Sequence, residues 1–110
     1  MYKRQILHLD VAVPLGLIVS ELITNAVKHA FDGIDIPELT IELISLGDHL
    51  ELWVRDNGVG LSEDFDFNSG DLGLGADIIV ALTDQIDGEM AFFNKNGASF
   101  RISFQNKALD

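Results

Sequence analysis

The sequence predicts an α+β fold, a two-layer sandwich in which helices cover one face of a mixed, mostly antiparallel sheet. Two segments repeat apolar residues at helical spacing, and each is followed by two segments that alternate apolar and polar residues. Alternating pairs joined by short polar turns are typical of β-hairpins, whose strands are antiparallel. An all-parallel doubly wound sheet is therefore disfavoured.

The composition indicates one globular domain over residues 1–110, with 47% hydrophobic and 23% charged residues. The absence of Cys excludes a disulfide scaffold and a thiolate metal site, and is consistent with a cytoplasmic protein. The net charge of −11 argues against nucleic-acid binding, which needs a basic surface. No apolar run approaches the roughly 20 residues that span a bilayer, so we expect no direct membrane contact.

The first expected elements are a short edge strand and a long helix. The apolar run Ile6–Leu9 predicts the strand, and the helical pattern extends over Leu15–Phe31. Asp10 is the expected N-cap, and Pro14 suits the first helical turn. An Asp-Gly turn signal directly after Phe31 predicts the end of the helix.

One edge of this helix is polar, with four functional groups at i, i+4, i+7 and i+8: Glu21, Asn25, Lys28 and His29. A carboxylate, a carboxamide, an ammonium and an imidazole in one row can hold a divalent cation and the anion that accompanies it. The same row also fits a solvated helix face with i,i+4 pairs. The helix alone leaves both interpretations open.

Four strands and a second helix follow. The expected hairpins pair Leu39–Ser45 with Leu50–Arg55 and Met90–Phe93 with Ser99–Phe104. Between them, residues 61–72 lack a clear period and predict a loop or lid, and residues 73–86 return to helical spacing. Alternation in the last strand points three residues inward: Phe100, Ile102 and Phe104.

The first hairpin runs directly into the sequence DNGVG. Gly58 and Gly60 permit a tight turn and a close backbone approach. Asp56, at the end of the strand, would point a fixed acceptor into the resulting pocket, and an exocyclic amine such as that of adenine is a natural partner. An ordinary Asx turn explains the same pattern.

A second glycine motif consists of Gly73, Leu74 and Gly75 and comes directly before a helix. Backbone N–H groups and the positive end of the helix dipole can there face an anion. A hinge at the start of a helix accounts for the same residues. The motif does not follow a strand, so it is not a Rossmann fingerprint, and no P-loop is present.

In this order, the polar-edged helix, DNGVG, GLG and the terminal NGASF resemble the ATP-binding (GHKL or Bergerat) domain of histidine kinases, gyrase-type topoisomerases, Hsp90 chaperones and mismatch-repair ATPases. Within that superfamily, VPLGLIVSELITNAVKHAF, DNGVGLSEDFD and GASFRISF are similar to sensor histidine kinases of the second HisKA type. The resemblance covers the chain from about Leu9 to Phe104.

The resemblance implies that ATP and Mg²⁺ are the ligands. Glu21 matches the acidic catalytic position near the metal, and Asn25 matches the Mg²⁺ ligand. Lys28 and His29 match residues that contact phosphate oxygens. Asp56 matches the acceptor of the adenine amine, and Gly58 and Gly60 match the glycines that shape its pocket. The glycine box that closes over the phosphates is matched by Gly73, Leu74 and Gly75. Ser99 matches a hydroxyl that supports the adenine through Asp56 and water.

The implied activity is transfer of the γ-phosphoryl group of ATP to a histidine on a phosphoacceptor domain of the same protein, and from there to a response regulator. His8, His29 and His49 lack the sequence context of that acceptor, so the chain is expected to be a fragment without its own substrate. We expect the fragment to be monomeric and the intact protein to be a homodimer.

Two alternatives remain open. An anti-sigma-factor serine kinase has the same motifs and a different acceptor. A degenerate nucleotide-binding or interaction module would account for Asp71 and Leu72, which stand where the family's glycine box begins with glycine.

Overall fold

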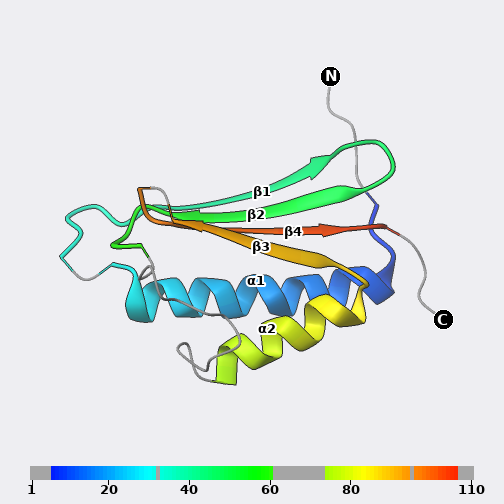
Figure 1. Ribbon diagram of the computed structural model, residues 1–110, viewed down its shortest axis with the longest axis horizontal. Coiled ribbons are helices and arrows are strands. Elements are labelled where there is room, and N and C mark those ends of the chain that lie inside the picture. The colour runs from blue at the N-terminus through cyan, green and yellow to red at the C-terminus, as the bar shows by residue number, and fades with distance from the viewer. Residues whose placement is uncertain (1–5, 32, 61–73, 95, 107–110) are drawn as a thin grey trace.

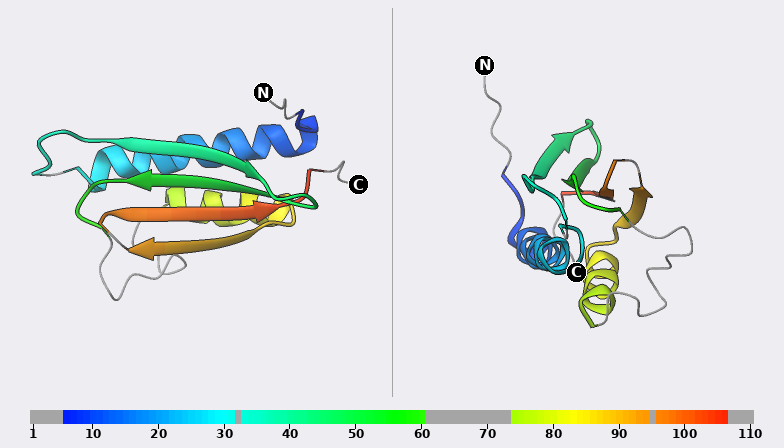
Figure 2. Two further views of the ribbon diagram at one scale, coloured as in Figure 1. Left: turned by 90° about the horizontal axis from the view of Figure 1, so that it is seen from above. Right: turned by 90° about the vertical axis from the view of Figure 1, so that its left-hand side faces the viewer.

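The computed structural model describes residues 6–31, 33–60, 74–94 and 96–106, which form two layers (Figure 1). One layer contains helices α1 (Leu9–His29) and α2 (Leu74–Gln85). The other is a sheet of four strands: β1 (Leu39–Ser45), β2 (Leu50–Asp56), β3 (Glu89–Asn94) and β4 (Ala98–Phe104). Both helices lie on the same face of the sheet (Figure 2). The predicted α+β sandwich is confirmed.

The strand order is β1-β2-β4-β3. The two predicted hairpins are present, and they are joined by pairing of β2 with β4, in which Val54 lies opposite Phe100. Each of these pairings is antiparallel. The prediction was a mixed, mostly antiparallel sheet, and the described part of the sheet has only antiparallel pairs.

The core lies between the sheet and the helices. Residues of β2 and β4 alternate between buried and partly exposed, as expected for strands with one face against helices. The core side chains come from both layers: Val11, Leu15, Ile18, Leu22, Leu50, Leu52, Val54, Ile79, Ile86, Ala98, Phe100, Ile102 and Phe104. Full burial of each large apolar side chain contributes about 1.5–3 kcal/mol, so this cluster is the main source of stability.

The predicted strand Ile6–Leu9 is wrong. Leu9 is the first residue of α1, and Ile6–His8 is not a strand. The Asn106 side chain, just beyond β4, holds this segment by two hydrogen bonds. Its Oδ1 accepts from the His8 N–H at 2.9 Å, and its Nδ2 donates to the Ile6 carbonyl at 2.7 Å. A contact between the two ends of the sequence thus replaces the expected strand.

The start of α1 also differs from the prediction. His8, with extended backbone, is the N-cap residue, and Asp10 lies in the first turn. Pro14 lies inside the helix, which continues on both sides of it. Proline has no N–H to donate to the fourth residue before it, and the helix tolerates this loss near its beginning. Helix α1 ends at His29, two residues before the predicted end at Phe31.

By length and composition alone, residues 9–28 could cross a membrane, with a mean hydropathy of 1.5 over 20 residues. The expectation that no run is apolar enough was therefore wrong. In the fold, Val11, Ile18 and Leu22 of this helix are buried in the core. Helix α1 is thus a core helix of the two-layer structure.

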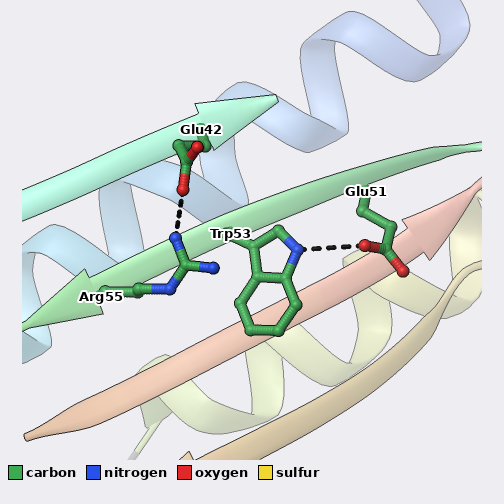
Figure 3. Close-up of polar contacts among 4 residues, drawn as sticks. All are labelled: Glu42, Glu51, Trp53 and Arg55. Atoms are coloured by element: carbon green, nitrogen blue, oxygen red, sulfur yellow. Dashed lines mark hydrogen bonds and ion pairs between the residues drawn. The ribbon is translucent and has the colours of Figure 1, made fainter. Parts of the chain in front are cut away.

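The face of the sheet that points away from the helices carries an aromatic and guanidinium cluster (Figure 3). The Trp53 ring stacks on Phe93 at a centroid distance of 5.7 Å, and the Arg55 guanidinium lies 4.3 Å from the indole centroid. Arg55 also pairs with Glu42, and Trp53 Nε1 donates to Glu51 at 3.1 Å. These contacts order the outer face of the sheet.

Candidate functional site

A cavity of about 40 Å³ lies between the C-terminal half of α1 and the sheet. Two polar side chains line it, Asn25 from α1 and Asp56 from the end of β2. The other lining residues are apolar or glycine: Leu22, Ala26, Ala30, Leu39, Val54, Gly60, Ala98 and Phe100. Such a site, mostly apolar with a few placed polar groups, is typical of a small-molecule pocket.

The Asp56 carboxylate is held in a fixed orientation. Its Oδ1 accepts from the Gly58 N–H at 2.9 Å and from the Ala98 N–H at 3.1 Å. Both bonds use the same oxygen, and within the described residues Oδ2 has no hydrogen-bond donor. Asp56 can therefore present Oδ2 to a donor group of a ligand without rearranging.

The loop after β2 packs closely on the end of α1. The Val59 N–H donates to the Ala30 carbonyl at 2.9 Å. A Cβ on Gly58 would lie 2.1 Å from the same carbonyl oxygen, so only glycine fits there. Gly60 lines the cavity. The structure thus brings Gly58, Gly60 and Asp56 together, and the glycines let the loop approach α1.

Asn25 has a polar atom that is buried and has no partner among the described residues, its Nδ2. An unpaired buried polar group is costly, so this atom is available to a hydrogen-bond partner such as a ligand or an ordered water. The amide oxygen of Asn25 is a chemically suitable ligand for Mg²⁺, which retains several water molecules and is often shared with substrate phosphates. The described residues contain no cluster of three or more His, Cys, Asp or Glu that could hold a metal ion alone.

The other predicted residues of α1 lie near Asn25. Glu21 is half-buried one turn before it, and Lys28 is exposed one turn after it. His29 is the last residue of α1. Leu74 and Gly75 begin α2, and Gly73 lies outside the described residues, as does the predicted lid. In Figure 1 the start of α2, the end of α1 and the end of β2 lie at the same end of the molecule.

The structure places Ser99 on the opposite face of the sheet from Asp56. Ser99 lines a hollow with Trp53 and Phe93, whereas Ala98 and Phe100 line the cavity. Among the described residues it is the Ala98 backbone N–H that donates to Asp56 Oδ1, and the predicted water-mediated role of the Ser99 hydroxyl stays a prediction. The alternation that points Phe100 inward also points Ser99 outward.

Two histidines lie away from the cavity. His8 precedes α1 at its other end. His49, in the turn after β1, has its Nδ1 2.7 Å from Asp48 Oδ1, and this hydrogen bond holds the pKa of Asp48 below its ordinary value. Neither histidine can take part in chemistry at the cavity in this conformation.

Residues 10–108 match the family model described as histidine kinase-, DNA gyrase B-, and HSP90-like ATPase. The chain is 54% identical over 44 residues to the serine-protein kinase RsbW of Listeria monocytogenes, covering 40% of this chain and 28% of that protein. It is 40% identical over 67 residues to blue-light-activated histidine kinase 2 of Erythrobacter litoralis, covering 58% and 19%.

Solved structures give the same result. The histidine kinase domain of a blue-light activated histidine kinase from Erythrobacter litoralis has a TM-score of 0.79 and 30% identity, covering 88% of this chain and 45% of that one. The fold and these matches define a histidine kinase-type ATPase domain. The chain belongs to the histidine kinase-, DNA gyrase B- and HSP90-like ATPase family. It spans less than a third of the length of the two curated relatives above.

Proposed function

We propose that the chain binds Mg-ATP in the cavity and supplies the γ-phosphoryl group to a histidine on a separate domain. The observation that carries this proposal is the pairing, in one apolar cavity, of a fixed carboxylate acceptor on Asp56 with a buried unpartnered amide on Asn25. The first suits the exocyclic amine of adenine, and the second suits the metal and phosphate end of the nucleotide.

The remaining residues of α1 would act on the phosphates. Bound Mg²⁺ would neutralise part of the phosphate charge. Lys28, exposed near the end of the helix, can reach a phosphate oxygen with its ammonium group. Glu21 is the candidate catalytic carboxylate near the metal. Leu74 and Gly75 open α2, whose N-terminal amides favour an anion.

The partners also belong to the proposal. The relatives include proteins named as histidine kinases, and this chain matches part of their length. We infer a phosphoacceptor histidine domain in the same protein, a response regulator as the next acceptor, a homodimeric intact protein and a cytoplasmic reaction. Residues 1–110 would form the single ATP-binding domain of that assembly.

Two measurements test the proposed function. Titration calorimetry with Mg-ATP should show binding, and absence of binding at millimolar ATP would favour a degenerate module. Radiolabelled ATP should then label a supplied helical-hairpin domain that carries an exposed histidine. Label that is lost in acid and retained in base identifies phosphohistidine, and absence of label on that domain would contradict the proposed acceptor.

A serine kinase is the second candidate, because the match to RsbW is 54% identical over 44 residues. The expected acceptor is then a serine on an antagonist protein, with a sigma factor as the binding partner. Phosphoserine keeps its label in acid, so the same assay separates the two activities.

We expect the substitution Asn25→Ala to remove the Mg²⁺ dependence of ATP binding and leave adenosine binding nearly unchanged. The reason is that Asn25 lines the cavity and its amide oxygen is the proposed ligand of Mg²⁺. Calorimetry with and without Mg²⁺ measures the effect. Thr24→Ala is the control, since within the described ranges the exposed Thr24 hydroxyl bonds only to the Ser20 carbonyl of the same helix. Retained Mg²⁺ dependence in Asn25→Ala would exclude Asn25 as the ligand.

A further inference from the structure

Asn57 lies beside the acceptor Asp56, but its side chain does not line the cavity. Its Oδ1 accepts from the Glu38 N–H at 2.9 Å, and its Nδ2 donates to the Ile36 carbonyl at 2.9 Å. The Asn57 backbone N–H also donates to the Glu38 carbonyl at 3.3 Å. Asn57 therefore holds the segment Ile36–Glu38 at both ends.

This segment leads directly into β1, and its next residue, Leu39, lines the cavity. In the pairing of β1 with β2, Leu39 lies opposite Asp56, and these two residues form the pair at the cavity end of the ladder. Asn57 extends that ladder by one further step, because its side chain takes the place of a backbone partner for Glu38 and Ile36. The apolar wall at Leu39 and the acceptor at Asp56 are thus joined through Asn57.

We propose that Asn57 is a positioning residue for the nucleotide base. It fixes the backbone before Leu39 relative to Asp56, and so sets the gap in which a planar ring must fit between an apolar wall and a hydrogen-bond acceptor. This inference rests on the proposed binding of ATP in the cavity. Asn57 is exposed and does not line the cavity, so its effect would pass through Leu39.

The chain contains a matched control for this role. Asn106 makes the same pair of bonds with Ile6 and His8: its Oδ1 accepts from the N–H of one residue, and its Nδ2 donates to the carbonyl of the residue two positions earlier. Its two bonds place it beside the start of α1. In Figure 1 the start of α1 lies at the opposite end of the molecule from the end of α1, where the cavity-lining residues are. Removal of either side chain breaks two hydrogen bonds of similar length and exposure, but only Asn57 is next to the cavity.

The experiment compares Asn57→Ala, Asn57→Asp and Asn106→Ala by urea unfolding, calorimetry with adenosine and Mg-ATP, and amide hydrogen exchange. We expect similar decreases in the urea midpoint for the two alanine variants. Asn57→Ala should raise the Kd of adenosine and of Mg-ATP by the same factor, at least about fivefold, and Asn106→Ala by less than about twofold. Asn57→Asp keeps the acceptor and loses the donor, so its effect should be intermediate.

Hydrogen exchange gives a readout that needs no nucleotide. The Glu38 amide should exchange faster in Asn57→Ala than in the parent and at the parent's rate in Asn106→Ala. The His8 amide should exchange faster in Asn106→Ala and at the parent's rate in Asn57→Ala. If Asn57→Ala loses stability but binds adenosine like the parent, the positioning role is refuted. If the parent binds no adenine nucleotide, the proposed function fails, and the Glu38 amide still decides: faster exchange supports the positioning of the cavity wall, and unchanged exchange overturns it.

Discussion

The substitution Asp56→Asn is expected to weaken binding of an ATP analogue by at least about tenfold, on the order of 1.4 kcal/mol. The asparagine can still accept from Gly58 and Ala98 through Oδ1, so the loop keeps its shape. The second carboxylate oxygen becomes an NH₂ group, which opposes the donor amine of adenine with another donor. Calorimetry with a non-hydrolysable analogue measures the loss.

Asp48→Asn is the matched control, because it makes the same chemical change at the opposite end of the β1–β2 hairpin. Asp48 is exposed and interacts with His49, far from the cavity. The Asp48→Asn variant should bind the nucleotide with the same affinity as the parent. Equal affinity of Asp56→Asn and the parent would exclude Asp56 as the base acceptor.

The substitution Gly97→Ala is expected to damage both folding and binding. Gly97 has φ +120, and a Cβ there would lie 2.1 Å from the Asp56 carbonyl oxygen and 3.0 Å from Asp56 Oδ1. Alanine would therefore push the start of β4 away from Asp56 and break the bond from the Ala98 N–H. We expect the free energy of unfolding to fall by about 2–4 kcal/mol, with loss of detectable nucleotide binding.

Gly47→Ala separates backbone strain from this overlap. Gly47 has φ +89 in the β1–β2 turn, and a Cβ there would meet nothing within 4 Å. It should lose about 1 kcal/mol of stability and no affinity. If Gly97→Ala behaves like Gly47→Ala, the contact between Gly97 and Asp56 does not hold the site together.

The strands were predictable because their side chains alternate and polar turns separate them. The expected strand Leu39–Ser45 has the observed bounds, β2 and β4 differ from the prediction by one residue at one end, and β3 is longer by one residue at each end. The start of α1 was not predictable in the same way. Proline is common in the first turn of a helix, but Pro14 lies inside α1. The segment before α1 is held by Asn106, which is far away in the sequence.

Two of the side chains predicted for the site line the cavity. Asn25 and Asp56 follow from helical spacing and from the end of a strand, and both line the cavity. The backbone donor of Ala98 was missed because a motif is recognised by side chains, and alanine has none that is polar. The role proposed for Asn57 depends on its hydrogen bonds to Ile36 and Glu38, and no sequence pattern predicts that this segment lies beside Asn57.

The placement of Trp53 on the outer face of the sheet gives the protein an internal optical probe. It is the only tryptophan in the chain, and its ring contacts Phe93 and Arg55 on the side away from the cavity. Its emission should change when the sheet unfolds and hardly at all when a nucleotide enters. Folding and ligand occupancy can therefore be followed separately in one sample, which is the separation that the variants of Gly97 and Asn57 require.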